Sequence, residues 1–246
     1  MSSELPSVCP LDCPDTCSLS VTVENGKVDK VRGSKANPLT NGVICNKVSR
    51  YYPEFVHGEN RLTTPLKRTG PKGSGQFEPI SWEEALDRVF DNFTAIIEEH
   101  GPEAVMPLNY AGPHGMLAGG SMDLRFFHRL GATLLKRRPM CGGIKSEAYA
   151  GTFGTMPSMQ PEQAVHSKLI VVWGNNVTYS NLHLSPLIKK AKANGGKLVV
   201  VDPKRIKIAE QADVHLAVRP GMDIVLAFAI TRELESLGAF DADFMG

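Results

Sequence analysis

Four cysteines near the start of the chain have the spacing of ligands for a metal centre. Cys9, Cys13 and Cys17 lie within nine positions in the stretch CPLDCPDTC, and Cys45 follows after a longer gap. Three thiolates on one loop plus a distant fourth can surround a cubane iron–sulfur cluster, with one cysteine for each iron. Structural zinc is the alternative, but zinc sites usually pair their ligands as two C-x2–4-C units. The spacing favours a cluster over zinc, and either of these over disulfides.

The composition of the chain argues against several classes of function. Its 246 residues include 27 basic and 26 acidic side chains, and a net charge of +1 gives no support for a nucleic-acid or anionic membrane partner. The first residues show no export signal, and no apolar run approaches the roughly 20 residues that span a bilayer. We therefore expect a cytoplasmic protein, in which clustered thiols are metal ligands or redox groups more often than disulfides.

Local signals predict a β-rich start and a long helix after a linker. Residues 18–33 alternate around Asn25-Gly26, a pair that tolerates positive φ at both central turn positions and predicts a hairpin. Residues 63–79 are rich in Pro, Gly and Lys, so we interpret them as a linker that follows a domain boundary near residue 60. Ser81 then begins a capping box ahead of apolar residues at helical spacing.

The second half of the chain alternates between predicted strands and helices. Residues 168–174 and 197–203 contain continuous apolar runs of the kind that lie buried on both faces of a parallel sheet. A third strand is predicted at 214–220. Helices are expected at roughly 181–194, between the first two strands, and at 223–238, after the third.

These segments predict an α/β protein with two domains. Residues 1–60 form a small β-rich domain that holds the cysteine cluster, and residues 61–246 form a doubly wound α/β domain that binds a cofactor. The strand–helix pattern stops while it is still in progress. We therefore expect the chain to be the front part of a longer protein, incomplete at its C-terminus.

Six short motifs occur along the chain in one order: CPLDCPDTC, GVICNK, WEEAL, VVWGNN, VVVDPK and VRPGMD. In this order the sequence resembles the molybdopterin oxidoreductase family, whose members carry molybdenum or tungsten on two molybdopterin guanine dinucleotides and include formate dehydrogenases and dimethyl sulfoxide reductase. The resemblance spans the whole chain. It implies a [4Fe–4S] cluster held by Cys9, Cys13, Cys17 and Cys45, a bis-molybdopterin guanine dinucleotide cofactor, and molybdenum or tungsten.

The resemblance also gives roles to a lysine and to the fifth cysteine. Lys47 stands two positions after Cys45, where the family often has a lysine between cluster and pterin; a solvated surface lysine is the alternative. Cys141 lies in the region from which the family commonly ligates its metal, and a thiolate suits a metal already bound by dithiolene sulfurs. A small buried core cysteine is the alternative there.

Residues that follow the three predicted strands are placed to hold the guanine dinucleotide. In open α/β sheets, ligands bind at the carboxyl ends of the strands, although ordinary turn chemistry also uses Gly, Asn and Asp there. Asp202 is placed like the acid that accepts hydrogen bonds from ribose hydroxyls, and the resemblance assigns the guanine edge to Asp223. The candidate cofactor-binding residues are Lys47, Trp173, Gly174, Asn175, Asn176, Asp202, Lys204, Gly221 and Asp223.

The implied activity is oxidation or reduction of a small-molecule substrate at molybdenum or tungsten, with electrons passing through the adjacent cluster to an electron-transfer partner protein. The candidate catalytic residues are Cys141, Lys47 and Asp12. Two alternatives stay open: a hydratase in which an acid such as Asp12 donates a proton, and a metal-free electron-transfer subunit of a respiratory complex. We favour a loop role for His114 over a proton carrier, and we expect no turnover by this chain alone.

Overall fold

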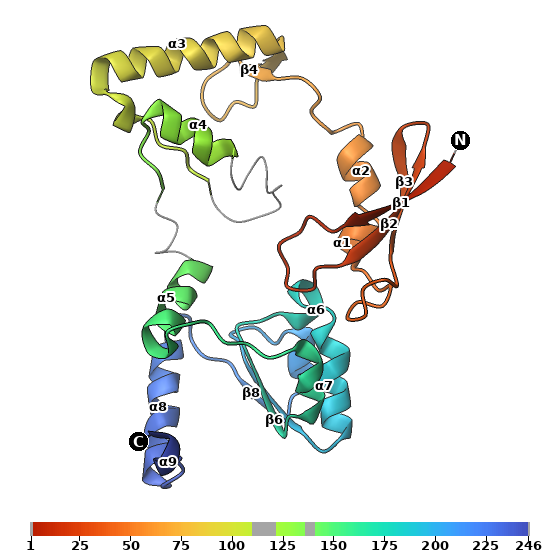
Figure 1. Ribbon diagram of the computed structural model, residues 1–246, viewed down its shortest axis with the longest axis vertical. Coiled ribbons are helices and arrows are strands. Elements are labelled where there is room, and N and C mark those ends of the chain that lie inside the picture. The colour runs from red at the N-terminus through yellow and green to blue at the C-terminus, as the bar shows by residue number, and fades with distance from the viewer. Residues whose placement is uncertain (1, 110–121, 136–140, 246) are drawn as a thin grey trace. The chain divides into compact units, whose positions relative to one another are not determined.

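A computed structural model describes residues 2–109, 122–135 and 141–245 of the chain (Figure 1). Its contacts divide the chain into two compact units, which are residues 1–12 with 16–158, and residues 13–15 with 159–246. An antiparallel sheet comes first and a parallel α/β region follows, which confirms the predicted fold class. The domain boundary near residue 60 stays a prediction.

The first unit begins with a three-stranded antiparallel sheet. Strands β2 (Ser18–Glu24) and β3 (Lys27–Gly33) form the predicted hairpin, with φ of 51° at Asn25 and 77° at Gly26. Both angles are positive, as a type I′ turn requires. Strand β1 (Ser2–Val8) pairs with the other side of β2, so the sheet gains an edge strand that the sequence analysis did not predict.

A small apolar core holds this sheet to two short helices. Helix α1 (Asn46–Ser49) and helix α2 (Tyr52–His57) both contact β3. A Cβ on Gly33 would lie 2.2 Å from the carbonyl oxygen of Gly42, so only glycine lets the loop before α1 pass so close to the end of β3. The buried side chains of this core are Cys17, Leu19, Val31 and Val48.

The segment interpreted as a linker is more regular than predicted. It contains a two-stranded antiparallel hairpin, in which β4 (Leu66–Arg68) pairs with β5 (Phe77–Pro79). The chain reverses between these strands through Gly73 and Gly75, which have φ of 89° and 70°. The glycines that suggested flexibility therefore supply the positive φ of a folded turn.

Helix α3 (Trp82–His100) begins where the sequence predicts. The Ser81 Oγ accepts a hydrogen bond from the Glu84 N–H at 3.1 Å, which satisfies one of the free donors at the start of the helix. The unit continues with η1 (Pro102–Ala104), α4 (Asp123–Leu130) and α5 (Gly142–Phe153).

The second unit is built on a parallel sheet whose strands are ordered β6-β7-β8. Figure 1 labels β6 and β8 of this sheet. Strands β6 (Leu169–Trp173), β7 (Lys197–Val201) and β8 (Val214–Leu216) confirm the three predicted strands, although the third is shorter than predicted. Burial on both faces holds for the central strand β7 but not for β6, which exposes Leu169 and Val171 at the edge of the sheet. The buried core is Val172, Val177, Ile188, Leu198, Val200, Ile208 and Ala209.

Helices connect these strands as the alternating pattern predicts. Helix α7 (Leu184–Ala193) lies between β6 and β7 and contributes Ile188 to the core, and α8 (Asp223–Ser236) follows β8. Both helices confirm the predicted ones, with boundaries shifted by a few residues at one end. The remaining elements of the unit are η3 (Pro161–His166), α6 (Val177–Ser180), η4 (Lys207–Gln211) and α9 (Ala242–Met245).

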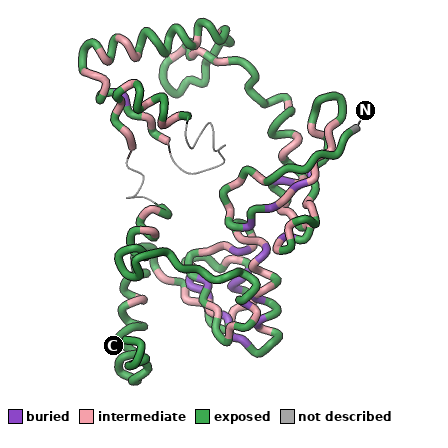
Figure 2. The backbone as a smooth tube through the Cα atoms, in the orientation of Figure 1, coloured by how far each residue is buried: buried purple, intermediate pink, exposed green. Residues whose placement is uncertain are grey.

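Helices α3 and α8 carry no buried residue, and Figure 2 shows both without a buried position. In α8, apolar side chains such as Ile224 and Phe228 are exposed, at 60% and 67% of their surface. An apolar helix normally has its side chains covered by other elements, and α8 lacks such cover among the described residues. Within those same residues, no helix combines the length and apolar character needed to cross a bilayer.

A charged contact fastens β7 to the segment before β8. The Asp213 Oδ2 accepts hydrogen bonds from the Leu198 N–H at 2.7 Å and from the Lys192 Nζ at 2.9 Å, while the Lys197 Nζ lies 3.5 Å from Oδ1. The backbone hydrogen bond, followed by the two lysines, lowers the pKa of Asp213 to about 2. These contacts favour the ionised carboxylate, so they stabilise the fold only while Asp213 is charged.

Replacing Asp213 with Asn should lower the free energy of unfolding at neutral pH, because the amide loses both ion pairs. An unfolded aspartate has a pKa of about 3.9. The contribution of Asp213 is therefore fully present above that pH and is lost as the pH falls through about 2. Urea unfolding of wild type and D213N should give stabilities that converge in acid. The control is E210Q, which removes an exposed carboxylate from the same unit. A difference in the free energy of unfolding between wild type and D213N that does not change with pH would contradict this account.

Candidate functional site

Three of the four candidate cluster ligands gather around one core in the first unit. Cys17 is only 7% exposed, and Cys9 and Cys45 pack half-buried against the same core. The Cys9 N–H donates to the Cys17 carbonyl at 2.9 Å, which closes the loop between β1 and β2. Cys45 has an extended backbone directly ahead of α1. The hairpin and the short helices thus bring cysteines that are distant in sequence to one place.

The possible donors for a metal centre in this core are thiols. Among the described residues, no three His, Cys, Asp or Glu side chains are grouped closely enough to hold one metal ion. Zinc would need its thiolates at about 2.3 Å from one centre, which forces the sulfurs close together. A cubane sets its thiolates further apart, because each binds a different iron. All five cysteines of the chain are thiols, so the donor set fits an iron–sulfur cluster.

Cys13 belongs by its contacts to the second unit, together with the two residues that follow it. Asp15 is buried there, and its Oδ2 accepts a hydrogen bond from the Leu182 N–H at 2.9 Å. Its Oδ1 lies 3.3 Å from the Nδ1 of His183, and both side chains are only 6% exposed. This pair was not predicted from the sequence, because no local pattern links a cysteine loop to the segment before α7. Asp15 therefore fixes this part of the loop through a buried carboxylate.

The three candidate catalytic residues are all exposed. Asp12 lies between Cys9 and Cys13, and its exposure contrasts with the burial of Asp15. Lys47 lies in the last turn of α1.

Cys141 stands directly before α5 and has φ of 49° and ψ of −128°, a backbone conformation that residues other than glycine rarely adopt. Strain of this kind is often found at functional positions. Cys141 is exposed in the part of the chain that the structure describes. His114 lies outside the described residues.

Two polar residues beside the cysteine loops were not found by the sequence analysis. Tyr52 packs against the core that contains Cys17, and its burial, followed by the thiolates of Cys9 and Cys45, raises its pKa. Asn37 donates a hydrogen bond from Nδ2 to the Thr16 carbonyl at 3.1 Å. The Asn-Pro pair that begins at Asn37 is a recognised turn signal, but it does not identify the partner of the side chain.

Two candidate cofactor residues from different motifs meet at the carboxyl end of β6. The Trp173 Nε1 donates to the Asp223 Oδ1 at 2.6 Å, which fixes the first residue of α8 against the last residue of β6. Gly174 follows with φ of 60°, and its N–H donates to the Val201 carbonyl at the end of β7. Asn176 then accepts a hydrogen bond at Oδ1 from the Thr178 hydroxyl.

Asp202 is held at the corresponding end of β7. Its Oδ1 accepts a hydrogen bond from the Lys204 N–H at 2.8 Å, which makes a local turn, and its carbonyl lies 2.9 Å from the His215 Nε2. Gly221, with φ of 84°, precedes α8 after the third strand. Because the three strands are parallel, the segments after them lie at one edge of the sheet. Asn175 lies in the same segment as Asn176, and its carbonyl accepts a hydrogen bond from the Val177 N–H.

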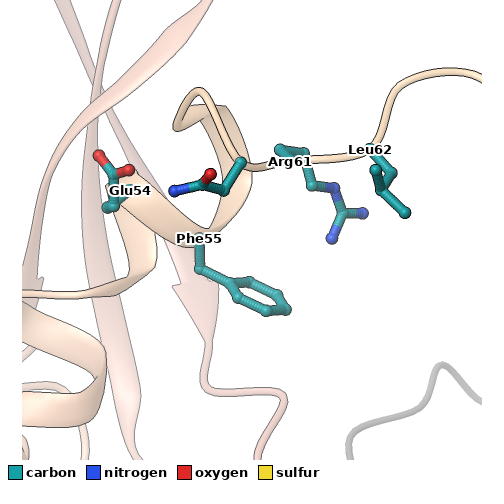
Figure 3. Close-up of a pocket in the computed structure, with 5 residues that line it drawn as sticks. Glu54, Phe55, Arg61 and Leu62 are labelled. Carbon is teal, nitrogen blue, oxygen red and sulfur yellow. The ribbon is translucent and has the colours of Figure 1, made fainter. Parts of the chain in front are cut away.

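The first unit also has a surface hollow of about 540 Å³, lined by Glu54, Phe55, Asn60, Arg61 and Leu62. The Arg61 guanidinium lies 5.4 Å from the centre of the Phe55 ring, and Figure 3 shows both side chains projecting to the same side of the backbone. None of its lining residues was a predicted site residue. The hollow is formed largely by exposed side chains, so we assign it no role.

Comparison with known proteins is consistent with this geometry. Residues 61–236 match the family model described as molybdopterin oxidoreductase, and residues 3–57 match the model described as the molybdopterin oxidoreductase Fe4S4 domain. These matches support the predicted [4Fe–4S] and molybdopterin cofactors.

The chain is similar to curated proteins and to a solved structure along nearly its whole length. It is 41% identical to the "Probable oxidoreductase YoaE" of Bacillus subtilis, covering 97% of this chain and 35% of that protein. It is 29% identical to formate dehydrogenase H of Escherichia coli, covering 97% and 34%. The structure of acetylene hydratase from Pelobacter acetylenicus aligns with a TM-score of 0.74 at 26% identity, covering 97% and 33%. The chain thus spans about a third of the length of these relatives.

Replacing Asp15 with Ala should destabilise the protein by about 3 kcal/mol, because the Leu182 N–H and the buried His183 would lose their partner. D15N keeps the shape and one acceptor oxygen, so its loss should be about half as large. D12A removes an exposed carboxylate from the same loop and should cost less than about 0.5 kcal/mol. Urea unfolding measures all three; a D15A variant as stable as D12A would show that the buried pair contributes nothing.

Proposed function

Because the chain belongs to the molybdopterin oxidoreductase family, we propose that the protein is a redox enzyme that oxidises or reduces a small-molecule substrate. The observation that carries this proposal is the gathering of Cys9, Cys17 and Cys45 around one core, in the segment that matches the Fe4S4 domain. When bound, the cofactors supply substrate chemistry at molybdenum or tungsten and single-electron transfer at the cluster.

We assign the cluster to Cys9, Cys13, Cys17 and Cys45. The first, third and fourth share the small core, and Cys13 lies in the loop between Cys9 and Cys17. Helix α1 starts immediately after Cys45 and carries Lys47, so a cation stands two residues from a ligand. Positive charge near a cluster stabilises the reduced form, because reduction adds negative charge. In this proposal Lys47 therefore favours electron transfer to the cluster.

We assign the guanine dinucleotide to the carboxyl edge of the parallel sheet. The Trp173 indole fixes one oxygen of Asp223, and the other oxygen can accept hydrogen bonds from the N–H groups of a guanine edge. Asp202 is oriented by the Lys204 N–H and can accept from ribose hydroxyls. Cys141 is the proposed protein ligand of molybdenum or tungsten, because a soft thiolate matches the sulfur donors of the pterin.

A hydratase is the second candidate, and the similarity to acetylene hydratase favours it. In such an enzyme the metal would act as a Lewis acid and a carboxylic acid would move a proton. Asp12 is accessible enough for that role, whereas Asp15 is buried and already paired. An electron-transfer partner protein is expected only for the redox enzyme. The partner and the cytoplasmic location stay predictions.

Anaerobically purified protein should contain about four irons and four acid-labile sulfides, with negligible zinc. C45A should lose most of this iron, because one corner of the cubane would lack its thiolate. C141A should keep its iron, since that thiol is assigned to a different centre, and it serves as the matched control. Metal and sulfide analysis on one sample measures all of these. One zinc without sulfide in wild type, or full iron in C45A, would overturn the ligand assignment.

Replacing Lys47 with Ala should separate the two candidate functions. A redox enzyme should lose roughly tenfold or more of its viologen-linked turnover, since a charge beside the cluster would be missing. A hydratase should hydrate acetylene at an almost unchanged rate. Because we expect no turnover by this chain alone, the assays use the longer protein of which the sequence predicts this chain to be the front part. Formate, dimethyl sulfoxide, nitrate and acetylene serve as probes, with K72A as a control that removes an exposed lysine elsewhere. Full viologen-linked activity in K47A would exclude the role proposed for this lysine.

A further inference from the structure

The hydroxyl of Thr40 is buried without a hydrogen-bond partner among the described residues. The residue is only 1% exposed, and its Oγ1 is one of the few buried polar side-chain atoms in this state. Such a hydroxyl loses its hydrogen bonds to water when the chain folds, and no hydrogen bond within the protein replaces them. Buried polar groups left unpaired in a native fold commonly mark the place of a water, an ion or a redox group.

Asn37 fixes the backbone of Thr40 beside the three-cysteine loop. Its Oδ1 accepts hydrogen bonds from the Leu39 N–H at 3.0 Å and the Thr40 N–H at 3.3 Å. Its Nδ2 donates to the carbonyl of Thr16 at 3.1 Å. A single amide group therefore separates Thr40 from the residue that precedes Cys17.

On its other side, Thr40 leads by a tight turn to Cys45. The Thr40 carbonyl accepts a hydrogen bond from the Val43 N–H at 2.8 Å, and the turn passes through Asn41 and Gly42, with φ of 42° and 79°. Cys45 then packs against the core that contains Cys17. Thr40 is thus linked through Asn37 to the residue before Cys17, and it stands five residues before Cys45.

We propose that the Thr40 hydroxyl donates a hydrogen bond to a sulfur of the [4Fe–4S] cluster, either a cysteine thiolate or a bridging sulfide. The inference rests on the proposed ligand assignment to Cys9, Cys13, Cys17 and Cys45. Sulfur atoms of a cluster become more negative on reduction, so a donor stabilises the reduced form more than the oxidised form. Thr40 thereby raises the reduction potential of the cluster, and Asn37 acts as its positioning residue.

The substitution T40V tests this, because valine keeps the volume and removes the hydroxyl. The measurement is an anaerobic redox titration of the purified protein, with the reduced cluster followed by electron paramagnetic resonance. T40V should shift the reduction equilibrium roughly tenfold toward the oxidised form, a potential about 59 mV more negative for one electron. T40S keeps the donor and should stay within about twofold of wild type. T22V removes a threonine hydroxyl from β2, outside the ligand loops, and should leave the potential unchanged.

The outcomes distinguish this inference from the assignment on which it rests. A cluster-loaded T40V with the wild-type potential overturns the inference alone, and it points to a water as the partner of the hydroxyl. A wild-type protein that holds no cluster overturns the ligand assignment and the inference with it. Where T40V loses iron, T40A is titrated in its place; a wild-type potential in cluster-loaded T40A also overturns the inference, and a shift like that expected for T40V supports it.

Discussion

Cys17 meets two requirements at once, in the small core that holds the antiparallel sheet to α1 and α2. Its side chain is part of the buried core with Leu19, Val31 and Val48, while its carbonyl closes the loop that starts at Cys9. Close-packed cores give their members little freedom to move, so the packing of the hairpin fixes the cysteine loop. Cys45 reaches the same core through a loop that passes within contact of Gly33. The proposed ligand geometry therefore depends on a very small apolar core.

In the second unit, the direction of the strands brings the candidate cofactor-binding residues together. Three parallel strands deliver Trp173, Asp202 and the segment before Asp223 to one edge, although these residues lie far apart in sequence. Two hydrogen bonds then orient the carboxylates at this edge. The Trp173 indole N–H donates to Asp223, and the Lys204 backbone N–H donates to Asp202. Both carboxylates are oriented before any ligand arrives. Preorganised acceptors of this kind reduce the ordering cost of binding.

The sequence was sufficient to predict features that depend on neighbouring residues. Asn25-Gly26 specifies its turn through the φ values that it tolerates, and Ser81 specifies a helix start through its own hydroxyl. The apolar runs at β6 and β7 likewise indicate strands by composition alone. The strands, and therefore the shared edge, follow from such local patterns.

Contacts between distant residues were not predictable in this way. Asp15 and His183 form their buried pair only after the chain has folded, and neither has a local signal that names the other. The same holds for Asn37 and the Thr16 carbonyl, and for the pairing of β1 with β2. Glycine-rich composition was also ambiguous, since residues 63–79 could be a flexible linker or a hairpin. These features depend on contacts between residues that are distant in the sequence, and a single sequence does not show which residues make contact.

The position of Asp223 has a thermodynamic consequence. This carboxylate is the first residue of α8, the helix whose apolar side chains lack cover among the described residues. Exposed elements with few contacts open at low free energy, so the helix that carries Asp223 is among the parts most easily disordered. If Asp223 binds the guanine dinucleotide as proposed, that binding includes the free energy of keeping α8 folded. By linkage, a surface that covers α8 would then increase the affinity at Asp223, and a nucleotide bound there would strengthen the attachment of that surface by the same factor.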